Sequence, residues 1–540
     1  MKTTRHALPM QKTSGGEVID TRPPDIEDWL NSLPYVDFER TSALLEEATA
    51  ATNKVDIKPA IRLELVALYN RPYQYYVDTQ IKLGSRHTLQ SIELMVRQIA
   101  VLSRIAANLA NACKLIAGEG VGHKTLWGRF KPYQVGMLQA IHYLSHELIF
   151  SYLQYTPAPD KFWREISKLY QQAEFAGLAS AELKLPEGFG GGGNRTIAEA
   201  YKRMAVIALL DPYHLPFGAI WEIYNQLERW SSLSSLEIFK RGCERHGAFA
   251  VDLDNAARPA PLEEFDDRNL RETHRIIVVR DLEEEINARL DSMNRNGRTD
   301  PDLCISPHIA RQVLMQMGKD LGTPPRRSSP RTASQGNVQL VFGINAIYFH
   351  GNGEKDFAAA TAEESEQVVT DNPNNEPQAG ALPAQYKAEH WNLMDMGPEG
   401  FSVSATAVQG NPIRVGDLVA IRREYIGRAG SSNWSLGDIR WMMKGSVGSN
   451  QYRLGIQIIA AEIMPAGLRA LTGGTHEIEY RRAIVAGDGL ERGMNNIVCA
   501  PGIYQTNREL ELSVNGQTLP AIAADLVEAS NNFEHLIIKV

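Results

Sequence analysis

The feature that most constrains the fold of this chain is a change in the spacing of its apolar residues near residue 321. From about Asp25 to Leu321 apolar residues recur mainly at helical spacing, and the run 92–102 is apolar on both faces of the helix it predicts. Beyond that point, short runs rich in β-branched and aromatic residues alternate with Gly, Asn and Pro. The 540 residues therefore exceed a single small fold and predict an α+β protein.

The helical part is predicted to be an all-α domain over residues 25–321, after a flexible N-terminus at 1–24. Its expected helices lie around 57–80, 133–154, 160–178, 195–210, 216–231 and 280–293, and a last one ends near residue 320. We find no regular 34-residue repeat with fixed anchor residues, so a tetratricopeptide-type solenoid is only an analogy of shape.

The β-rich part is predicted to contain a barrel over residues 322–470 and a small β segment over 471–540. Predicted strands include 338–342, 401–404, 417–421, 437–441, 454–459, 509–514 and 536–540. Residues 351–383 interrupt the barrel with seven acidic residues, one lysine and much Ala, Asn and Pro. Because this stretch has little apolar surface to bury, we expect a mobile insertion that ligand binding does not need.

Charge and cysteine content exclude several classes of protein. The 56 basic and 64 acidic residues leave a net charge of −8, which provides no global attraction for DNA or an anionic membrane. Cys113, Cys243, Cys304 and Cys499 lie far apart, without CxxC or zinc spacing, and predict reduced side chains. The N-terminus lacks the apolar core of a signal peptide, and no stretch looks like the roughly 18 apolar residues of a membrane span. We therefore expect a cytoplasmic protein with no DNA binding and no membrane insertion.

Two conspicuous motifs in the helical part have simple structural interpretations. Residues Gly188–Asn194 formally satisfy GxGxxG, but no strand precedes them, so we predict a flexible loop between helices. His142 and His146 lie one helical turn apart, yet HExxH order and a third ligand are missing, which favours a structural role over a metal site. With no GxSxG and no cysteine beside a base, we predict no catalytic residues, no metal and no cofactor.

The informative region begins at Arg326-Arg327-Ser328-Ser329-Pro330-Arg331, directly before the first predicted strand. RxxxR spacing also occurs at Arg241/Arg245 and Arg271/Arg275, in segments that look helical and where it is most simply surface charge. About 64 residues after Arg331, a strand runs into the Asp-x-small-x-x-Gly turn 395–400. The runs 415–421, 437–441 and 453–457 follow it.

In this order the pieces resemble the PilZ family, bacterial β-barrel receptors for cyclic di-GMP. The family pattern is RxxxR before the first strand and D/N-x-S-x-x-G on the next, and the resemblance covers about 322–465. This chain departs from it twice: Gly397 stands where serine is usual, and the acidic insertion lengthens the gap between the two motifs. The resemblance implies a cyclic di-GMP site formed by Arg326, Arg327, Arg331, Asp395, Gly397 and Gly400.

The chemistry of these residue types suits that ligand, which carries two phosphates and two guanines. Arginine holds phosphate in a bidentate manner, stacks on a purine face and donates to guanine O6 and N7. Aspartate accepts from guanine N–H groups, and glycine lets the backbone approach closely. Arg326 supplies a further charge if the ligand binds as a stacked dimer.

The function that follows is a non-enzymatic cyclic di-GMP receptor that relays the messenger to an unknown protein partner through its helical domain. A helical region before such a barrel also resembles a group of proteobacterial PilZ-containing proteins. The alternative is a helical protein-interaction scaffold with a degenerate barrel that binds no nucleotide, which the Ser-to-Gly departure favours. In the receptor interpretation the leader 322–335 is mobile without ligand and becomes ordered on binding.

Overall fold

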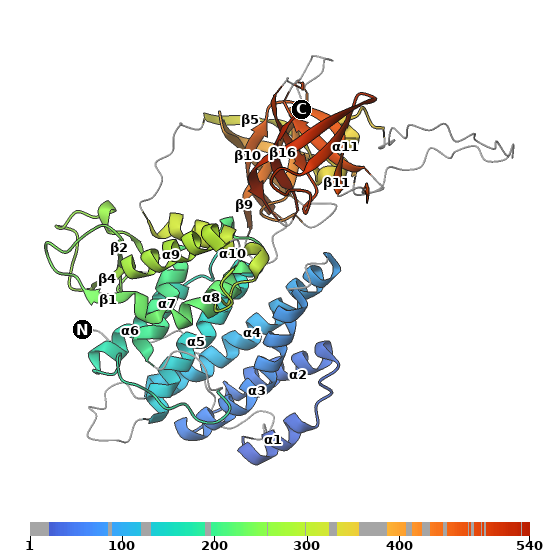
Figure 1. Ribbon diagram of the computed structural model, residues 1–540. Helices are drawn as coiled ribbons and strands as arrows, with labels where there is room; N and C mark the ends of the chain where they lie inside the picture. Colours follow the sequence, from blue (N-terminus) through green and yellow to red (C-terminus); the bar gives the residue numbers. More distant parts are fainter. Residues whose placement is uncertain are drawn as a thin grey trace. The chain divides into compact units, whose positions relative to one another are not determined.

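The chain forms two compact units, Met1–Pro325 and Arg326–Val540, shown as a computed structural model in Figure 1. The structure describes residues 21–84, 89–119, 131–189, 196–255, 257–296, 299–322, 332–355, 386–406, 413–423, 433–445, 451–472, 475–476, 480–487, 489–490, 493–530 and 532–540. The predicted flexible N-terminus up to residue 20, most of the leader and most of the acidic insertion lie outside these residues.

The first unit is helical, as expected. Its helices are α1 (Pro23–Asn31), α2 (Phe38–Thr52), α3 (Pro59–Gly84), α4 (Leu89–Glu119), α5 (Lys131–Leu153), α6 (Phe162–Phe175), α7 (Ile197–Leu209), α8 (Ala219–Arg229), α9 (Arg280–Asn296) and α10 (Pro307–Leu321). Helix α4 packs against α2, α3 and α5, which explains why the sequence of this helix is apolar on both faces. Helix α7 begins with a capping box, in which Thr196 Oγ1 accepts from Glu199 N and the Glu199 carboxylate accepts from Thr196 N.

One part of α4 differs from the sequence expectation about membrane spans. Within the described residues, Leu94–Gly118 is long and apolar enough to cross a membrane by length and composition alone. Of its most apolar window 61% is buried inside the unit, and Ile99, Leu102 and Ile105 are fully buried. A core helix of a bundle has the same composition, so the packing of α4 accounts for it.

The first unit also contains a small sheet that the expectation of an all-α domain missed. Strands β1 (Ser235–Ile238), β2 (Ala248–Asp252), β3 (Ala260–Pro261) and β4 (His274–Val278) form an antiparallel sheet in the order β1-β4-β2-β3. Strands of five residues or fewer carry too little periodicity to separate from helix or loop in the sequence.

This sheet corrects the interpretation of two arginine pairs as surface charge on helices. Arg275 lies on β4, is only 8% exposed, and forms an ion pair with Glu174 of α6. Arg245 lies in the turn before β2, where its guanidinium donates to the carbonyls of Leu262 and Phe265 at 2.8 and 2.9 Å. Arg275 thus connects the sheet to α6, and Arg245 connects the turn before β2 to the segment 262–265.

The second unit begins with a closed six-strand barrel. Its strands are β5 (Thr332–Phe342), β6 (Glu389–Gly397), β7 (Gly400–Thr406), β8 (Leu418–Arg423), β9 (Ser435–Lys444) and β10 (Gln451–Ala460), in the order β10-β7-β6-β5-β8-β9. Trp391 and Leu393 are buried between exposed neighbours on β6, the alternation of a strand with one face toward a barrel core. Helix α11 (Ile344–Gly351), which the sequence analysis did not predict, follows β5.

The C-terminal segment is larger than the predicted small β segment, and its first strand begins at residue 463 rather than after 470. Its strands are β11 (Ile463–Thr472), β12 (Thr475–His476), β13 (Arg481–Ala486), β14 (Met494–Cys499), β15 (Glu509–Val514), β16 (Gln517–Ala529) and β17 (Glu534–Lys539). Pairing of β11 with both β13 and β15 closes the ring β11-β13-β14-β17-β16-β15. When the six ring strands of each barrel are numbered in chain order, both rings read 1-2-3-6-5-4, so the second unit contains two barrels of the same topology.

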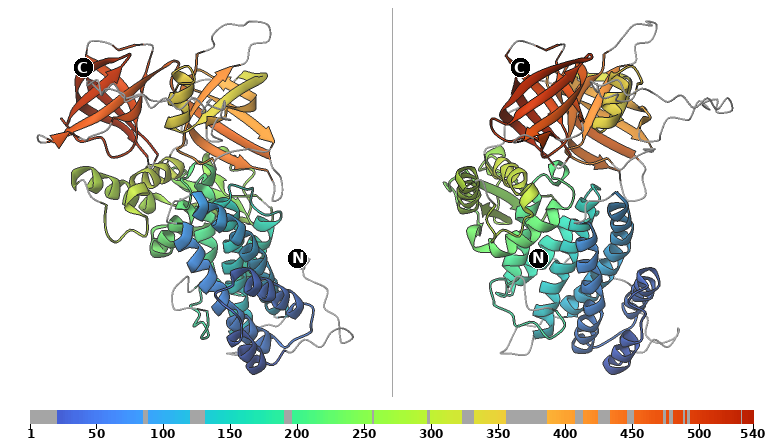
Figure 2. Two further views of the ribbon diagram at one scale, coloured as in Figure 1. Left: turned by 90° about the vertical axis from the view of Figure 1, so that its right-hand side faces the viewer. Right: turned by 45° about the vertical axis from the view of Figure 1, so that its right-hand side comes forward.

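The two barrels share an apolar layer in which α11 lies between them, as Figure 2 shows in yellow. The layer consists of Val341, Ala346, Ile347, Tyr348, Phe349, Tyr386, Leu418, Ala420, Trp434, Leu436, Ile484, Val498 and Phe533. At its edge the Arg440 guanidinium donates to both carboxylate oxygens of Glu528, at 2.8 and 2.9 Å. The Asn532 amide donates to Asp417 Oδ1 at 2.6 Å. We therefore treat the barrels as one packed body.

Candidate ligand site on the first barrel

The register of β5 and β6 brings the two separated motifs together in space. Thr332, the first residue of β5, is paired with Met396, and Ala333 is paired with Asp395. Arg331 directly precedes Thr332 in the chain, and β5 begins beside the Asp-x-small-x-x-Gly turn despite the long insertion between the two strands. Arg326, Arg327 and Arg331 lie outside the described residues, and their part in a site stays a prediction.

The turn itself is a tight hairpin between β6 and β7. Gly397 and Gly400 are paired, which leaves Pro398 and Glu399 as a two-residue loop. A Cβ atom at Gly400 would lie 2.2 Å from the Ile456 carbonyl oxygen of β10. A glycine is therefore required at position 400 because β7 approaches β10 closely there. The sequence analysis had instead attributed this glycine to the close approach of a ligand.

A row of paired residues crosses the outer face of the barrel from this turn. Asp395 on β6 is opposite Ser402 on β7, Ser402 is opposite Gly455 on β10, and Gly455 is opposite Trp441 on β9. The pairing shifts by one residue at Met394, and this bulge turns Asp395 to the outer face while Leu393 faces inward.

Ser402 is the most unusual member of this row, and sequence reasoning missed it. It is 1% exposed, and its Oγ has no hydrogen-bond partner among the residues that the structure describes. An unsatisfied buried hydroxyl costs about 1–3 kcal/mol, so it is uncommon in a folded protein without a functional reason. Only strand register could have revealed it, because Ser402 follows the sequence motif and lies on a different strand from Asp395.

An aromatic side chain and a cation complete this face. A Cβ atom at Gly455 would lie 1.8 Å from Trp441 Nε1, so the Trp441 side chain lies directly over Gly455, next to Ser402. In the next row, Arg453 on β10 is opposite Ser404 on β7. The outer face of β6, β7, β10 and β9 thus combines a carboxylate, hydroxyls, an indole and a guanidinium, the groups that recognise a guanine nucleotide.

Two family profiles match the chain. The one described as the N-terminal domain of the cyclic-di-GMP receptor FimW matches residues 24–241, and the one described as its middle PilZ domain matches 248–391 and 360–465. The chain belongs to the PilZ-domain family of cyclic di-GMP receptors. This bears out the resemblance seen in the sequence, and the closed barrel β5–β10 is the PilZ barrel. The PilZ profile also takes in β2, β4, α9 and α10, and these two matches end before most of the second barrel.

A characterised relative agrees with this assignment over nearly the whole length of both proteins. The chain is 21% identical, over an alignment 559 positions long, to a protein of Pseudomonas aeruginosa named cyclic-di-GMP receptor FimW. The alignment covers 93% of this chain and 88% of the relative. It is longer than either unit and therefore reaches into both.

Proposed function

We propose that this protein is a cytoplasmic cyclic di-GMP receptor, without enzymatic activity, in which the PilZ barrel captures the messenger and the helical unit carries the output to a protein partner. The observation that best supports this is the register of β5 with β6, which starts the strand after Arg331 opposite Met396 and Asp395. In this proposal Arg327 and Arg331 hold phosphates, Arg326 adds charge, and Asp395 accepts from a guanine edge.

The departure at Gly397 removes a hydroxyl from the usual motif, and Ser402 offers one in its place. Ser402 is the cross-strand neighbour of Asp395, and its buried Oγ lacks a partner among the described residues. A guanine donor directed at Asp395 can also bond this hydroxyl after a small shift of the side chains. Gly397 therefore does not by itself favour a barrel that has lost nucleotide binding.

Titration calorimetry of the full chain with cyclic di-GMP tests the proposal. We expect saturable binding, and Arg327→Ala and Arg331→Ala should each cost about 1.5–3 kcal/mol, on the order of 10- to 100-fold in affinity. Arg481→Ala, an exposed arginine at the start of β13 in the second barrel, is the matched control and should bind like the parent. Absence of saturable binding, or equal affinity of all three variants, would reject the receptor.

The scaffold alternative predicts a different outcome in the same preparation. If the helical unit captures its partner equally with and without cyclic di-GMP, and the chain does not bind the nucleotide, the barrel is degenerate. Of the predicted insertion 351–383, Gly351 ends helix α11 and 351–355 are described, so replacement of 356–383 by a short Gly/Ser linker is a further check. We expect unchanged affinity, because that stretch lacks a periodic apolar face.

The relay depends on the leader that links the two units covalently. Binding should order the leader, because arginines that bind a ligand at Asp395 are each restricted to one conformation. Hydrogen exchange with and without cyclic di-GMP should show new protection at 322–335 and 395–400, and also in the helical unit. Protection at the barrel alone, with unchanged small-angle scattering, would make the helical unit a passive scaffold.

A further inference from the structure

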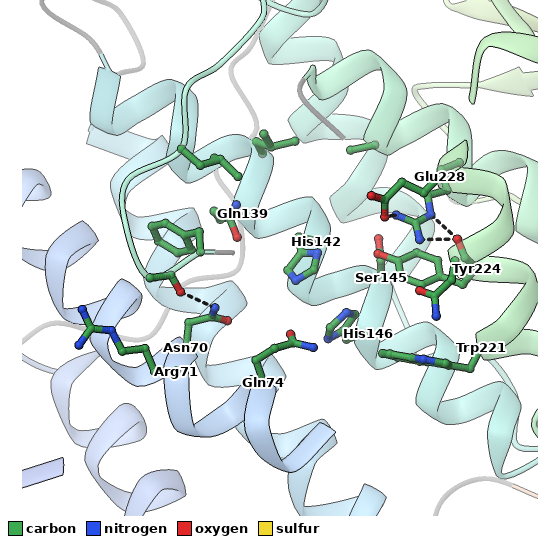
Figure 3. Close-up of a pocket in the computed structure, with 17 residues that line it drawn as sticks. Asn70, Arg71, Gln74, Gln139, His142, Ser145, His146, Trp221, Tyr224 and Glu228 are labelled. Atoms are coloured by element: carbon green, nitrogen blue, oxygen red, sulfur yellow. Dashed lines mark hydrogen bonds and ion pairs between the residues drawn. The ribbon is translucent and has the colours of Figure 1, made fainter. Parts of the chain in front are cut away.

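A cavity lies within the helical unit. It is lined by residues of α3, α5, α7, α8 and the stretch 185–189, and its volume is about 370 Å³ (Figure 3). This volume falls within the roughly 300–1,000 Å³ of small-molecule sites. The cavity is formed wholly by residues of the first unit, so it is distinct from the face that carries Asp395.

The two motifs that the sequence analysis set aside meet at this cavity. His142 and His146 project into it from α5 with their ring centroids 4.3 Å apart, and Gly188 closes another side. The Gly188 carbonyl accepts from the Asn70 amide at 2.8 Å. Gly188 has φ +101°, and a Cβ there would lie 2.9 Å from the Ala67 carbonyl oxygen. The glycine therefore presses the loop backbone onto α3 and fixes this wall.

The cavity holds polar groups but no unpaired charge among the described residues. The Arg203 guanidinium forms an ion pair with Glu228 at 3.0 Å and lies over the Tyr224 ring at 3.4 Å. Burial lowers the pKa of His142 to about 4 and that of His146 well below its usual value. Both imidazoles are therefore neutral at physiological pH, and each offers one donor and one acceptor. A charged occupant would be poorly stabilised.

Two polar side chains of α5 face the cavity. Gln139 is only 5% exposed, and Figure 3 draws no hydrogen bond from its amide or from the His142 ring to the other residues that line the cavity. By contrast, His146 Nδ1 lies 2.8 Å from the Tyr73 hydroxyl. Both side chains line the cavity, where their polar atoms can bond water or a ligand.

The remaining wall is aromatic. Trp221, stacked on Phe150 with an interplanar angle of 7°, lines the cavity together with Tyr224. An aromatic wall on one side of a cavity that also holds a carboxamide and a neutral imidazole favours a flat molecule with both donors and acceptors on its edge. We propose that this cavity binds a small uncharged heteroaromatic molecule of nucleobase or nucleoside type, held at its edge by Gln139 and His142.

Adenosine, guanosine and nicotinamide are the probes for this site, used with the full chain. We expect at least one to bind saturably in saturation-transfer NMR, with stronger transfer to ring than to ribose protons where ribose is present, and to raise the melting temperature. Gln139→Leu should weaken that binding at least tenfold.

Controls separate this site from a general loss of fold. Gln171→Leu on α6, whose amide donates to Asp254 at an exposed position, should leave probe binding unchanged. His142→Leu should weaken the probe as Gln139→Leu does, and both should bind cyclic di-GMP like the parent. The proposal is overturned if none of the three probes binds, which would leave water as the occupant. It is also overturned if both cavity variants bind the probe as tightly as Gln171→Leu.

Discussion

The two barrels of the second unit have the same strand order, but they use the corresponding outer face differently. In the PilZ barrel the end of the second strand carries Asp395, with Ser402 beside it on the third strand. In the C-terminal barrel the end of the second strand carries Ile484 and Ala486, which belong to the apolar layer packed on α11. One topology therefore provides a polar face, the proposed ligand site, in one barrel and a packing face in the other.

The chain segments that lead into the two barrels also differ. A Pro- and Ser-rich leader precedes β5, whereas β10 and β11 are joined by only Ala461 and Glu462. The start of β11 is also covered, since a Cβ at Gly351 of α11 would lie 3.0 Å from Ile463 Cδ1. The comparison teaches that strand order by itself does not say which barrel has a polar outer face; the residues at the ends of the strands do.

The largest effect on stability should come from placing a charge in the apolar layer between the barrels. Ile484→Asp places a carboxylate in the layer where Ile484 is fully buried, and should destabilise the second unit by about 4 kcal/mol or more. The converse change, Asp395→Ile, should keep the fold. Urea denaturation followed by circular dichroism measures both. Equal midpoints for Ile484→Asp and the parent would show that the layer between the barrels contributes no stability.

The next effect concerns the ligand face. Asp395→Ala should lower cyclic di-GMP affinity by about 1.5–3 kcal/mol, the range for a hydrogen bond to a charged group. Asp395→Asn should retain more affinity, because an amide oxygen still accepts from guanine. Asp525→Ala on β16 of the second barrel is the matched carboxylate control in calorimetry. A loss at Asp525 equal to that at Asp395 would place ligand contacts on both barrels.

The contact between the barrels should make their stability depend on pH. Burial raises the pKa of Asp438 to about 7, although Arg440 opposes the shift; burial also raises the pKa of Asp417 to about 7. Between the usual value of 3.8 and about 7 the native carboxyls hold protons that the unfolded chain has lost. Stability should therefore fall as pH rises through this window. Asp438→Asn should reduce the fall in urea midpoint between pH 5 and pH 8; an unaltered slope would contradict the assignment.

The smallest effect tests the Ser402 hydroxyl, which we propose in place of the serine hydroxyl that Gly397 lacks. Ser402→Ala should cost about 0.5–1.5 kcal/mol of cyclic di-GMP binding while leaving the unliganded chain as stable as the parent, or slightly more so. Ser513→Ala on β15 of the second barrel should change neither quantity. If Ser402→Ala binds as tightly as the parent but unfolds more easily, the hydroxyl has only a structural role.

Several elements were predictable from sequence because they carry local signals. Apolar spacing predicted the helical unit and the start of its core helix, and β-branched runs predicted β7, β8, β9 and β15. The sheet β1–β4 and helix α11 were missed because each element is short and lacks its own periodicity. The closure of 463–540 into a barrel was missed because it depends on the pairing of β11 with β15, some forty residues apart.

The candidate site shows the same division between local and long-range information. The residue order by itself determined the class of the protein, since RxxxR, the Asp395–Gly400 turn and the following strands are contiguous motifs that demand particular side chains and backbone freedom. Only the tertiary structure placed Ser402 beside Asp395 and Trp441 over Gly455, turned Ile484 into a packing residue, and gathered His142, Gln139 and Gly188 around one cavity. The physical reason is that register, closure and burial arise from contacts between distant segments, which no local spacing encodes.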